Sequence, residues 1–200
     1  MKIQYLNGGL ANQVFQYIFV RYAQLSSPQA EDWILDDSFF FTTQAHNGYE
    51  LEKVFGLKPR LLSQSFDADI WEELIKNKKN GCSIPQSFKN LGFDIIMLTE
   101  FENYREHNPF DGQIYHVPGN SFTPEIIHVS HEFVYYHGYW LHPKWFQSYQ
   151  SILQKELSFP PITDEKNLSY AGSILNSKSV AMHIRRGDYV GLGWASDCNY

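Results

Sequence analysis

The 200-residue sequence is poor in cysteine, in long apolar runs and in positive charge. Its two cysteines, Cys82 and Cys198, are too few for a disulfide framework, and no charged-then-apolar leader opens the chain. We therefore expect two reduced thiols, with a single bridge as the alternative. No apolar stretch approaches the about 20 residues that a membrane-spanning helix needs, so we expect a cytoplasmic chain without a transmembrane segment.

The charge balance is acidic, with 16 Lys and Arg against 22 Asp and Glu and a net charge of −6. A nucleic-acid-binding surface needs a basic stripe, so this balance argues against nucleic acid as a partner. The one dense lysine run, from Lys76 to Lys79, predicts a solvated helix end. His128 and His131 lack Cys, Asp or Glu at metal-ligand spacing, and no metal site is predicted.

The most informative segment lies near the carboxyl end. Ser179–Ile184 is a short apolar run that predicts a buried strand of a parallel sheet, and ligands of such sheets bind beyond the carboxyl ends of the strands. Alternation places His183 and Arg185 on one face and Arg186 on the other. One arginine then reaches a diphosphate while its neighbour pairs with Asp188. One alternative is an Arg–Asp pair that only fixes a turn. A second is that Arg186-Gly187-Asp188 is a cell-adhesion tripeptide, which is less favoured because the tripeptide would lie at the end of a core strand.

The amino end carries a second phosphate-type signal, a strand that runs into the turn Gly8-Gly9. Apolar residues then recur at three- and four-residue steps from Asn12 to Leu25, which predicts an amphipathic helix with Asn12 as its N-cap. Backbone N–H groups at such a helix start, approached through glycines, form an anion site. The pattern lacks the full G-x-G-x-x-G fingerprint and a P-loop lysine, and by itself it favours an ordinary strand-to-helix turn.

Between these ends the chain predicts an irregular middle, roughly residues 61–132, with one helix at Asp69–Lys78 whose Ile70, Leu74 and Ile75 face inward. Aromatic residues make up 16% of the chain and cluster at 39–41 and 135–140. Stacking on sugar rings is one use for these clusters. Core packing is favoured, because alternation within residues 134–140 fits a strand with one buried face.

The domain boundary is predicted at Pro160-Pro161, which stops a helix that starts at Pro143 and runs to about Leu157. A further helix, from about Asp164 to Leu175, leads to the strand that carries His183. Residues 1–159 are thus one α/β domain, and residues 160–200 begin a second.

Five segments together carry a resemblance to a known family. They are Gly8–Gln13 with the adjoining Phe15–Tyr17, Leu35–Phe40, Tyr49–Phe55, Tyr136–Trp140 and His183–Val190. In order and content they resemble glycosyltransferase family 11, the α-1,2-fucosyltransferases. Ala11 departs from the glycine that the family usually has, which costs roughly 1–2 kcal/mol if this residue needs a left-handed conformation. Family members are also roughly half as long again, so the chain resembles an amino-terminal, truncated portion.

The resemblance implies a GT-B-like fold, with a Rossmann-like acceptor-side domain at 1–159 and an incomplete GDP-sugar-binding domain from 160. The implied reaction transfers L-fucose from GDP-β-L-fucose to the 2-hydroxyl of a terminal β-galactoside with inversion. No cofactor or divalent metal is implied, because the arginines neutralise the diphosphate. The alternatives are an inactive remnant of such an enzyme and a glycosyltransferase that uses another nucleotide sugar. Peripheral association with a membrane is an alternative to a freely cytoplasmic location.

The resemblance also assigns roles to single residues. Arg185 stabilises the charge that grows on the leaving diphosphate, and Arg186 assists or braces it through Asp188. Asp188 is the second implied catalytic residue, in a structural role, because a carboxylate held against an arginine is a poor base. The acceptor's base is not identified. The implied substrate-binding residues are His183, Arg185, Arg186, Gly8, Gly9, Asn12 and Gln13.

Overall fold

The structure is a computed structural model that describes residues 1–27, 33–44, 46–119, 121–182, 190 and 193. The chain divides into two compact units, Met1–Phe159 and Pro160–Tyr200. This division falls at Pro160, where the sequence places the boundary. No helix in the described part of the chain combines the length and apolarity that crossing a membrane requires.

The first unit is built on a five-stranded sheet in which every neighbouring pair is parallel. Its strands are β1 (Lys2–Tyr5), β2 (Trp33–Asp36), β3 (Ile95–Thr99), β4 (Ile114–His116) and β5 (Phe133–His137), in the order β2-β1-β5-β3-β4. The predicted α/β class is therefore confirmed, and the sheet is compatible with a Rossmann-like fold. Because the strands are parallel, their carboxyl ends share one edge, here called the carboxyl edge.

Alternate residues of the strands feed two separate hydrophobic cores, one on each face. Val134 and Tyr136 of β5 pack into one core, whereas Phe133 and Tyr135 pack into the other. The expectation that this strand buries only one face is wrong, because β5 is a central strand between β1 and β3. Helices therefore cover both of its faces.

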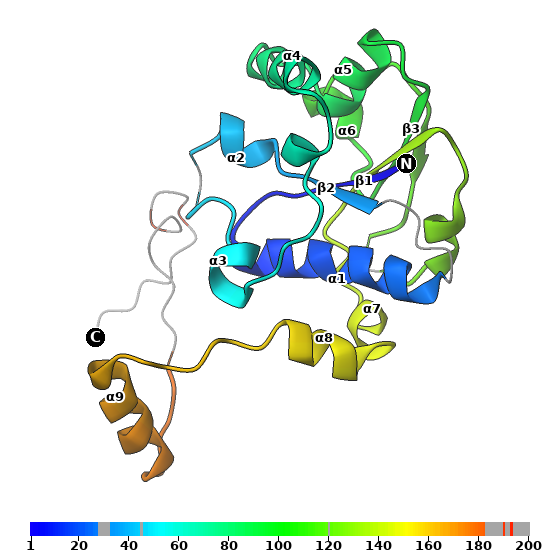
Figure 1. Ribbon diagram of the computed structural model, residues 1–200. Coiled ribbons are helices and arrows are strands. Elements are labelled where there is room, and N and C mark those ends of the chain that lie inside the picture. Colours follow the sequence, from blue (N-terminus) through cyan, green and yellow to red (C-terminus); the bar gives the residue numbers. More distant parts are fainter. Residues whose placement is uncertain (28–32, 45, 120, 183–189, 191–192, 194–200) are drawn as a thin grey trace. The chain divides into compact units, whose positions relative to one another are not determined.

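The long helix α1 (Leu10–Ser26) packs on one face together with α7 (Lys144–Gln147), and α4 (Ala68–Lys79) and α5 (Ile84–Asn90) lie on the other (Figure 1). Arg21 of α1 holds Glu156 of α8 (Gln150–Glu156) through Nη2 to Oε1 at 2.6 Å and Nε to Oε2 at 3.0 Å. The shorter helical elements are α2 (Phe39–Thr42), α3 (Leu51–Phe55), α6 (Tyr104–His107), η1 (Leu62–Gln64) and η2 (Pro124–His128).

Two helix predictions need correction. Helix α1 begins at Leu10 with Gly9 as its N-cap, so Asn12 lies inside the first turn and is not the cap. The helix expected from Pro143 to Leu157 is divided at Ser148 and Tyr149 into α7 and α8. The Tyr149 ring packs 5.6 Å from that of Tyr22 on α1, and its hydroxyl lies 3.1 Å from the Ser26 hydroxyl. Packing against α1 thus accompanies the break.

The middle of the chain is more regular than its composition suggests. Residues 61–132 hold α4, α5, α6 and the strands β3 and β4, so the expectation of an irregular region is wrong. Strand β3 is an uninterrupted apolar run, Ile-Ile-Met-Leu-Thr, whose five residues are all buried. A strand covered on both faces has no polar alternation, which is why periodicity alone does not reveal it.

The second unit has one described helix, α9 (Glu165–Leu175), capped by the Asp164 carboxylate, whose Oδ1 accepts the Asn167 N–H at 2.8 Å. The prediction of a strand over Ser179–Ile184 is wrong for the residues that the structure describes. Ser179 to Met182 are not in a strand, and Val180 is 93% exposed. An apolar run becomes a buried strand only when neighbouring strands pair with it, and no described strand lies in this unit.

Candidate functional site

The candidate site is the carboxyl edge, because ligands of parallel α/β sheets bind beyond the carboxyl ends of the strands. Two features lie there. One is the glycine loop, here defined as residues 7–13, which comprises the turn after β1 and the first turn of α1. The other is the edge pocket, a cavity of about 190 Å³ whose lining includes Tyr5, Lys78, Cys82, Tyr104, Asn108 and His137.

The glycine loop depends on the absence of a side chain at Gly8. This residue has φ of +77°, in the left-handed region, and a Cβ there would lie 2.4 Å from Nδ2 of Asn12. Asn12 is thus placed over Gly8, where the sequence predicts both to line a donor cleft. Ala11 lies in the right-handed helix α1 and is exposed, so its methyl group causes none of the strain considered above.

The Gln13 side chain holds the glycine loop through hydrogen bonds. Its side chain is fully buried, and Nε2 donates to the carbonyl oxygens of Gly8 at 3.0 Å and Gly48 at 2.9 Å. Its Oε1 accepts the Glu50 N–H at 2.9 Å. Both N–H donors of the amide are therefore used inside the protein. The predicted contact of Gln13 with substrate stays a prediction, and the geometry gives this residue a positioning role.

A second glutamine supports the loop and was missed by sequence reasoning. Gln16 is fully buried, donates from Nε2 to Asn7 Oδ1 at 2.6 Å and accepts the Asn7 N–H at 3.1 Å. It lies on α1 three residues after Gln13, which places both amides on the side of the helix that faces the loop. A glutamine pair at this spacing, buried within an apolar helix, is the signal that reveals it.

The start of α1 is suited to binding an anion. Its N-cap, Gly9, has no side chain to accept the first-turn N–H groups, and the first turn contains no acidic residue. The helix dipole and these donors favour negative charge at this point. Gly9 itself has φ of −76° and ψ of 177°, an extended conformation that brings the bare backbone to the loop surface. The arrangement provides N–H donors for phosphate oxygens.

The edge pocket lies on the face of the sheet that α4 and α5 cover, because Tyr5, Tyr135 and His137 alternate onto that face. The Tyr135 hydroxyl donates to Asp36 Oδ2 at 2.5 Å, and Asp36 Oδ1 accepts the Ser38 N–H at 2.9 Å. Strands β2 and β5, which lie on either side of β1, are thereby linked at their carboxyl ends.

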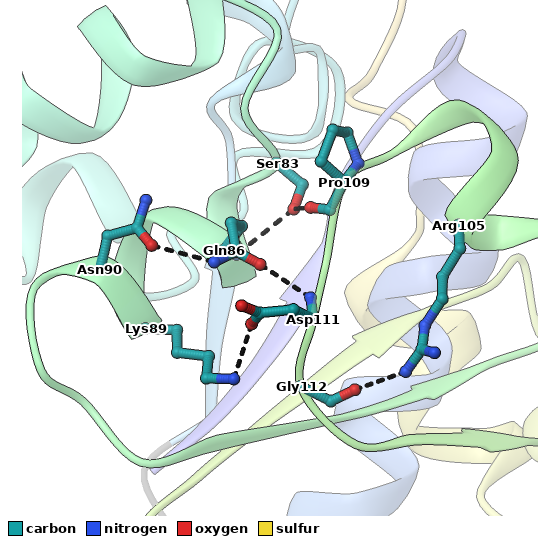
Figure 2. A network of polar contacts seen from close by, with 8 residues as sticks. All are labelled: Ser83, Gln86, Lys89, Asn90, Arg105, Pro109, Asp111 and Gly112. Carbon is teal, nitrogen blue, oxygen red and sulfur yellow. Dashed lines mark hydrogen bonds and ion pairs between the residues drawn. The ribbon is translucent and has the colours of Figure 1, made fainter.

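A polar network surrounds Ser83, which lines the edge pocket (Figure 2). Ser83, the N-cap of α5, accepts the Gln86 N–H and donates to the Pro109 carbonyl at 2.5 Å. The Gln86 side chain accepts the Asp111 N–H at 2.8 Å, and Lys89 pairs with the Asp111 carboxylate at 2.6 Å. The start of α5 is therefore fixed to the segment that follows α6.

Lys78 reaches into this region from the last turn of α4. Its Nζ donates to Ser38 Oγ at 2.7 Å and to the Tyr5 hydroxyl at 3.2 Å, and it lies 4.6 Å from the centre of the Tyr5 ring. Burial lowers the pKa of Lys78, and the carboxylates of Asp36 and Asp37 oppose this shift. The expectation that the lysine run only forms a solvated helix end is therefore wrong for this residue.

His137 ends β5 within an aromatic enclosure. Its ring centre lies 4.7 Å from that of Tyr5, 5.0 Å from that of Phe101 and 5.1 Å from that of Tyr104. Burial, assisted by the charge of Lys78, lowers the pKa of His137 to about 3. Its Nδ1 is buried with no hydrogen-bond partner among the described residues. The imidazole is thus neutral at physiological pH.

A more open cavity of about 500 Å³, here called the outer pocket, adjoins the edge pocket and shares Tyr104, His107, Asn108 and His137 with it. Glu100 lines the outer pocket, and its Oε2 accepts the N–H groups of Tyr139 at 2.6 Å and Trp140 at 2.9 Å. These bonds fix the turn after β5.

Trp140 completes that turn in a left-handed conformation, with φ of +55°, which few bulky residues adopt. Its indole N–H donates to Gln4 Oε1 at 2.7 Å, and Gln4 Nε2 donates to the Gly138 carbonyl at 3.2 Å. Gly138 is required here because a Cβ would lie 2.6 Å from Glu100 Oε2. The turn is thus held from β1 and from the end of β3.

The predicted site residues divide into two groups. Gly8, Gly9, Asn12 and Gln13 come together at the start of α1. His183, Arg185, Arg186 and Asp188 lie outside the described residues, as does Cys198, so their roles stay predictions. Sequence reasoning missed Lys78, His137 and the other residues of the edge pocket. Among the residues described, none form a group of three or more His, Cys, Asp or Glu placed to hold a metal ion.

Comparisons with protein-family models, with curated proteins and with solved structures found no match to this chain.

Proposed function

We propose that the chain serves the chemistry of an inverting α-1,2-fucosyltransferase with a GT-B-like architecture. Residues 1–159 are its acceptor-side domain, and the residues from 160 contribute to the GDP-sugar-binding domain. The observation that supports this proposal best is the glycine loop. A motif that resembles the family's opening motif forms a helix start at the carboxyl edge of a parallel sheet, with no side-chain cap and no acidic residue in the first turn.

The proposed reaction is a single displacement at the anomeric carbon of fucose. The 2-hydroxyl oxygen of a terminal β-galactoside forms a bond to C1, and the bond from C1 to the β-phosphate oxygen breaks with its electron pair going to GDP. The hydroxyl proton leaves to a base or to solvent. Because the entering oxygen and the leaving diphosphate occupy opposite faces, β-linked fucose becomes α-linked.

Stabilisation of the leaving diphosphate is the main catalytic task, because negative charge accumulates there in the transition state. Arg185 supplies the fork of N–H donors, with Arg186 assisting or bracing it through Asp188. His183 completes this side of the donor cleft. The arginine charges make a divalent metal or a cofactor unnecessary in this proposal.

The glycine loop supplies the second set of donors. Gly8 and Gly9 let a ligand approach the backbone closely, and the first-turn N–H groups of α1 offer an electropositive end to phosphate oxygens. Asn12 contributes a partly buried amide directly over Gly8. Gln13 and Gln16 hold this arrangement in place through the hydrogen bonds described above.

The test is transfer of fucose from GDP-fucose to lactose, with the linkage of the product determined. It is run on the 200-residue chain and, where the reading frame continues, on the longer natural product. Arg185→Ala should reduce turnover by about 10²–10³-fold, the effect of removing one transition-state donor. Lys53→Ala removes an exposed positive charge from α3 and is the matched control, which should retain turnover.

Other outcomes discriminate the alternatives. Consumption of a different nucleotide sugar would replace fucose as the donor but keep the cleft. A folded chain that binds no nucleotide would indicate an inactive remnant. Near-normal turnover of Arg185→Ala would refute the assigned role of that residue.

A further inference from the structure

We propose that the edge pocket binds one uncharged, hydroxyl-rich pyranose ring, and that the outer pocket takes the next ring of the same glycan. The assignment of this glycan as the acceptor rests on the proposed function, whereas the binding itself does not. The edge pocket, at about 190 Å³, has room for about six water molecules at about 30 Å³ each, which is the size class of one monosaccharide.

The hydrogen-bonding groups of the edge pocket have defined directions. An ammonium group only donates, so the bond between Lys78 and Tyr5 uses the tyrosine oxygen as acceptor. The Tyr5 hydroxyl proton, which has no acceptor in the described part of the chain, is then free to donate to a ligand. His137 is neutral and makes no side-chain hydrogen bond with any described residue, so one of its ring nitrogens is an acceptor. Sugar hydroxyl groups both donate and accept, and they match this pair.

Local charge argues against a phosphate or a carboxylate in this pocket. The cation of Lys78 is opposed by two carboxylates, because both Asp36 and Asp37 act on it. Asp36 is fully buried and holds the Tyr135 hydroxyl, so its charge is not screened by solvent at that point. Neither carboxylate lines the pocket, but both offset the positive charge of Lys78. A neutral ligand suits this environment, whereas the uncapped start of α1 suits an anion.

Aromatic rings enclose the same space. Tyr5, Tyr104 and Phe101 surround the His137 imidazole, and Phe101 keeps 37% of its surface exposed at the outer pocket. The apolar face of a pyranose packs on such rings while its hydroxyl groups reach polar side chains. Asn108 borders both cavities, so a second ring can extend from the first without leaving polar contacts.

The experiment is a titration of the chain with methyl β-D-galactopyranoside in the absence of any nucleotide. Histidine-ring NMR resonances are followed, together with saturation transfer to the sugar. We expect a saturable shift at His137 and transfer from aromatic protons to the sugar. His137→Phe keeps the ring packing but removes the acceptor, and it should weaken binding about tenfold.

His128→Phe is the matched control. His128 is exposed, and it follows Ile127, whose carbonyl accepts from Lys2 at the opposite edge of the sheet. This variant should bind the sugar as the unaltered chain does. If His137→Phe fails to fold, two other measurements provide the test. One is sugar binding by Tyr104→Phe, which loses only a hydroxyl group, and the other is saturation transfer on the unaltered chain.

Inorganic phosphate is the competing probe and should leave the His137 resonance in place. The proposal is overturned if no sugar concentration reached gives a saturable shift, if His137→Phe binds unchanged, or if phosphate rather than sugar shifts His137. The titration contains no donor, so it tests the pocket separately from transfer. Sugar binding in the titration, combined with no fucose transfer in the assay with GDP-fucose, would support the pocket and count against the proposed function. Transfer without sugar contact at His137 would do the reverse.

Discussion

The glycine loop and the edge pocket lie at the same edge of one sheet, yet they obtain their polar groups in opposite ways. The loop exposes backbone N–H groups at a helix start that has no acidic side chain in its first turn. The edge pocket instead gathers side chains from β1, α4, α6 and β5 beside two carboxylates. One feature favours negative charge, and the other favours a neutral ligand. In the proposed reaction, a single sheet edge would thus separate the phosphate of the donor from the sugar that receives the transferred group.

The two regions also differ in what would damage them. The loop depends on backbone conformation and on the two buried amides of Gln13 and Gln16, so the loss of a single atom changes its hydrogen bonds. The edge pocket depends on rings that pack around an imidazole, so its shape tolerates exchange of polar atoms for apolar ones of similar size. Changes in the loop should therefore cost more stability than changes in the pocket.

The largest effect is expected for Gln13→Glu. A carboxylate cannot donate to the carbonyl oxygens of Gly8 and Gly48, and it places an unpaired charge in a fully buried position. We expect the free energy of unfolding to fall by about 3–5 kcal/mol. Urea denaturation measures this change in the free energy of unfolding. Gln147→Glu, at an exposed position on α7, is the matched control and should change stability by less than about 0.5 kcal/mol.

A set of three glycine variants separates backbone strain from collision. Gly8→Ala combines a positive φ with a Cβ placed 2.4 Å from Asn12, and we expect a loss of about 2–3 kcal/mol. Gly56→Ala has a positive φ but open space around the Cβ, so about 1 kcal/mol is expected. Gly9→Ala has a negative φ and only an ordinary contact with His46, so it should change little. Equal losses at Gly8 and Gly56 would show that Asn12 moves aside freely.

Burial of His137 in the edge pocket should make the free energy of unfolding depend on pH. The pKa of His137 is lowered from 6.5 to about 3 in the folded chain, so between these values the unfolded chain binds a proton that the folded chain does not. The contribution of neutral His137 to the free energy of unfolding is fully present above pH 6.5 and is lost as the pH falls towards 3. We expect a loss of about 1–2 kcal/mol between pH 7 and pH 5.

His137→Phe should flatten this slope, whereas His128→Phe should preserve it. Urea denaturation at several pH values between 5 and 7 provides the measurement, in a range where most carboxylates stay ionised. A slope that is unchanged in His137→Phe would place the imidazole in contact with solvent and contradict the described enclosure.

The features that sequence reasoning predicted well are contiguous in the chain. The Gly-Gly turn after an apolar run, followed by three- and four-residue periodicity, indicates the order of β1, the loop and α1, and it locates both ends of α1 within two residues. The cap was misplaced because Gly9 takes the extended conformation itself, and a glycine cap leaves no side-chain signal. The division into two compact units falls at Pro160, the first of two consecutive prolines, which stop a helix.

The edge pocket could not be predicted, because its residues meet only after the sheet forms. Lys78 belongs to a lysine run whose composition predicts a solvated helix end. Its ammonium group is buried because α4 packs where this group can donate to Ser38 and Tyr5. His137 ends an aromatic run whose central position depends on the strand order β1-β5-β3. At Ser179 to Met182, by contrast, the apolar pattern suggested a strand where the structure has none.

We propose that the carboxyl edge separates a helix start that binds an anion from a pocket that binds a neutral ligand. A titration of the ¹⁵N-labelled chain with GDP, followed by amide and histidine-ring NMR, distinguishes the two regions. We expect saturable shifts at the amides of Gly9 to Asn12 and an unmoved His137 ring. Shifts centred on His137, with the first turn of α1 unaffected, would contradict this proposal.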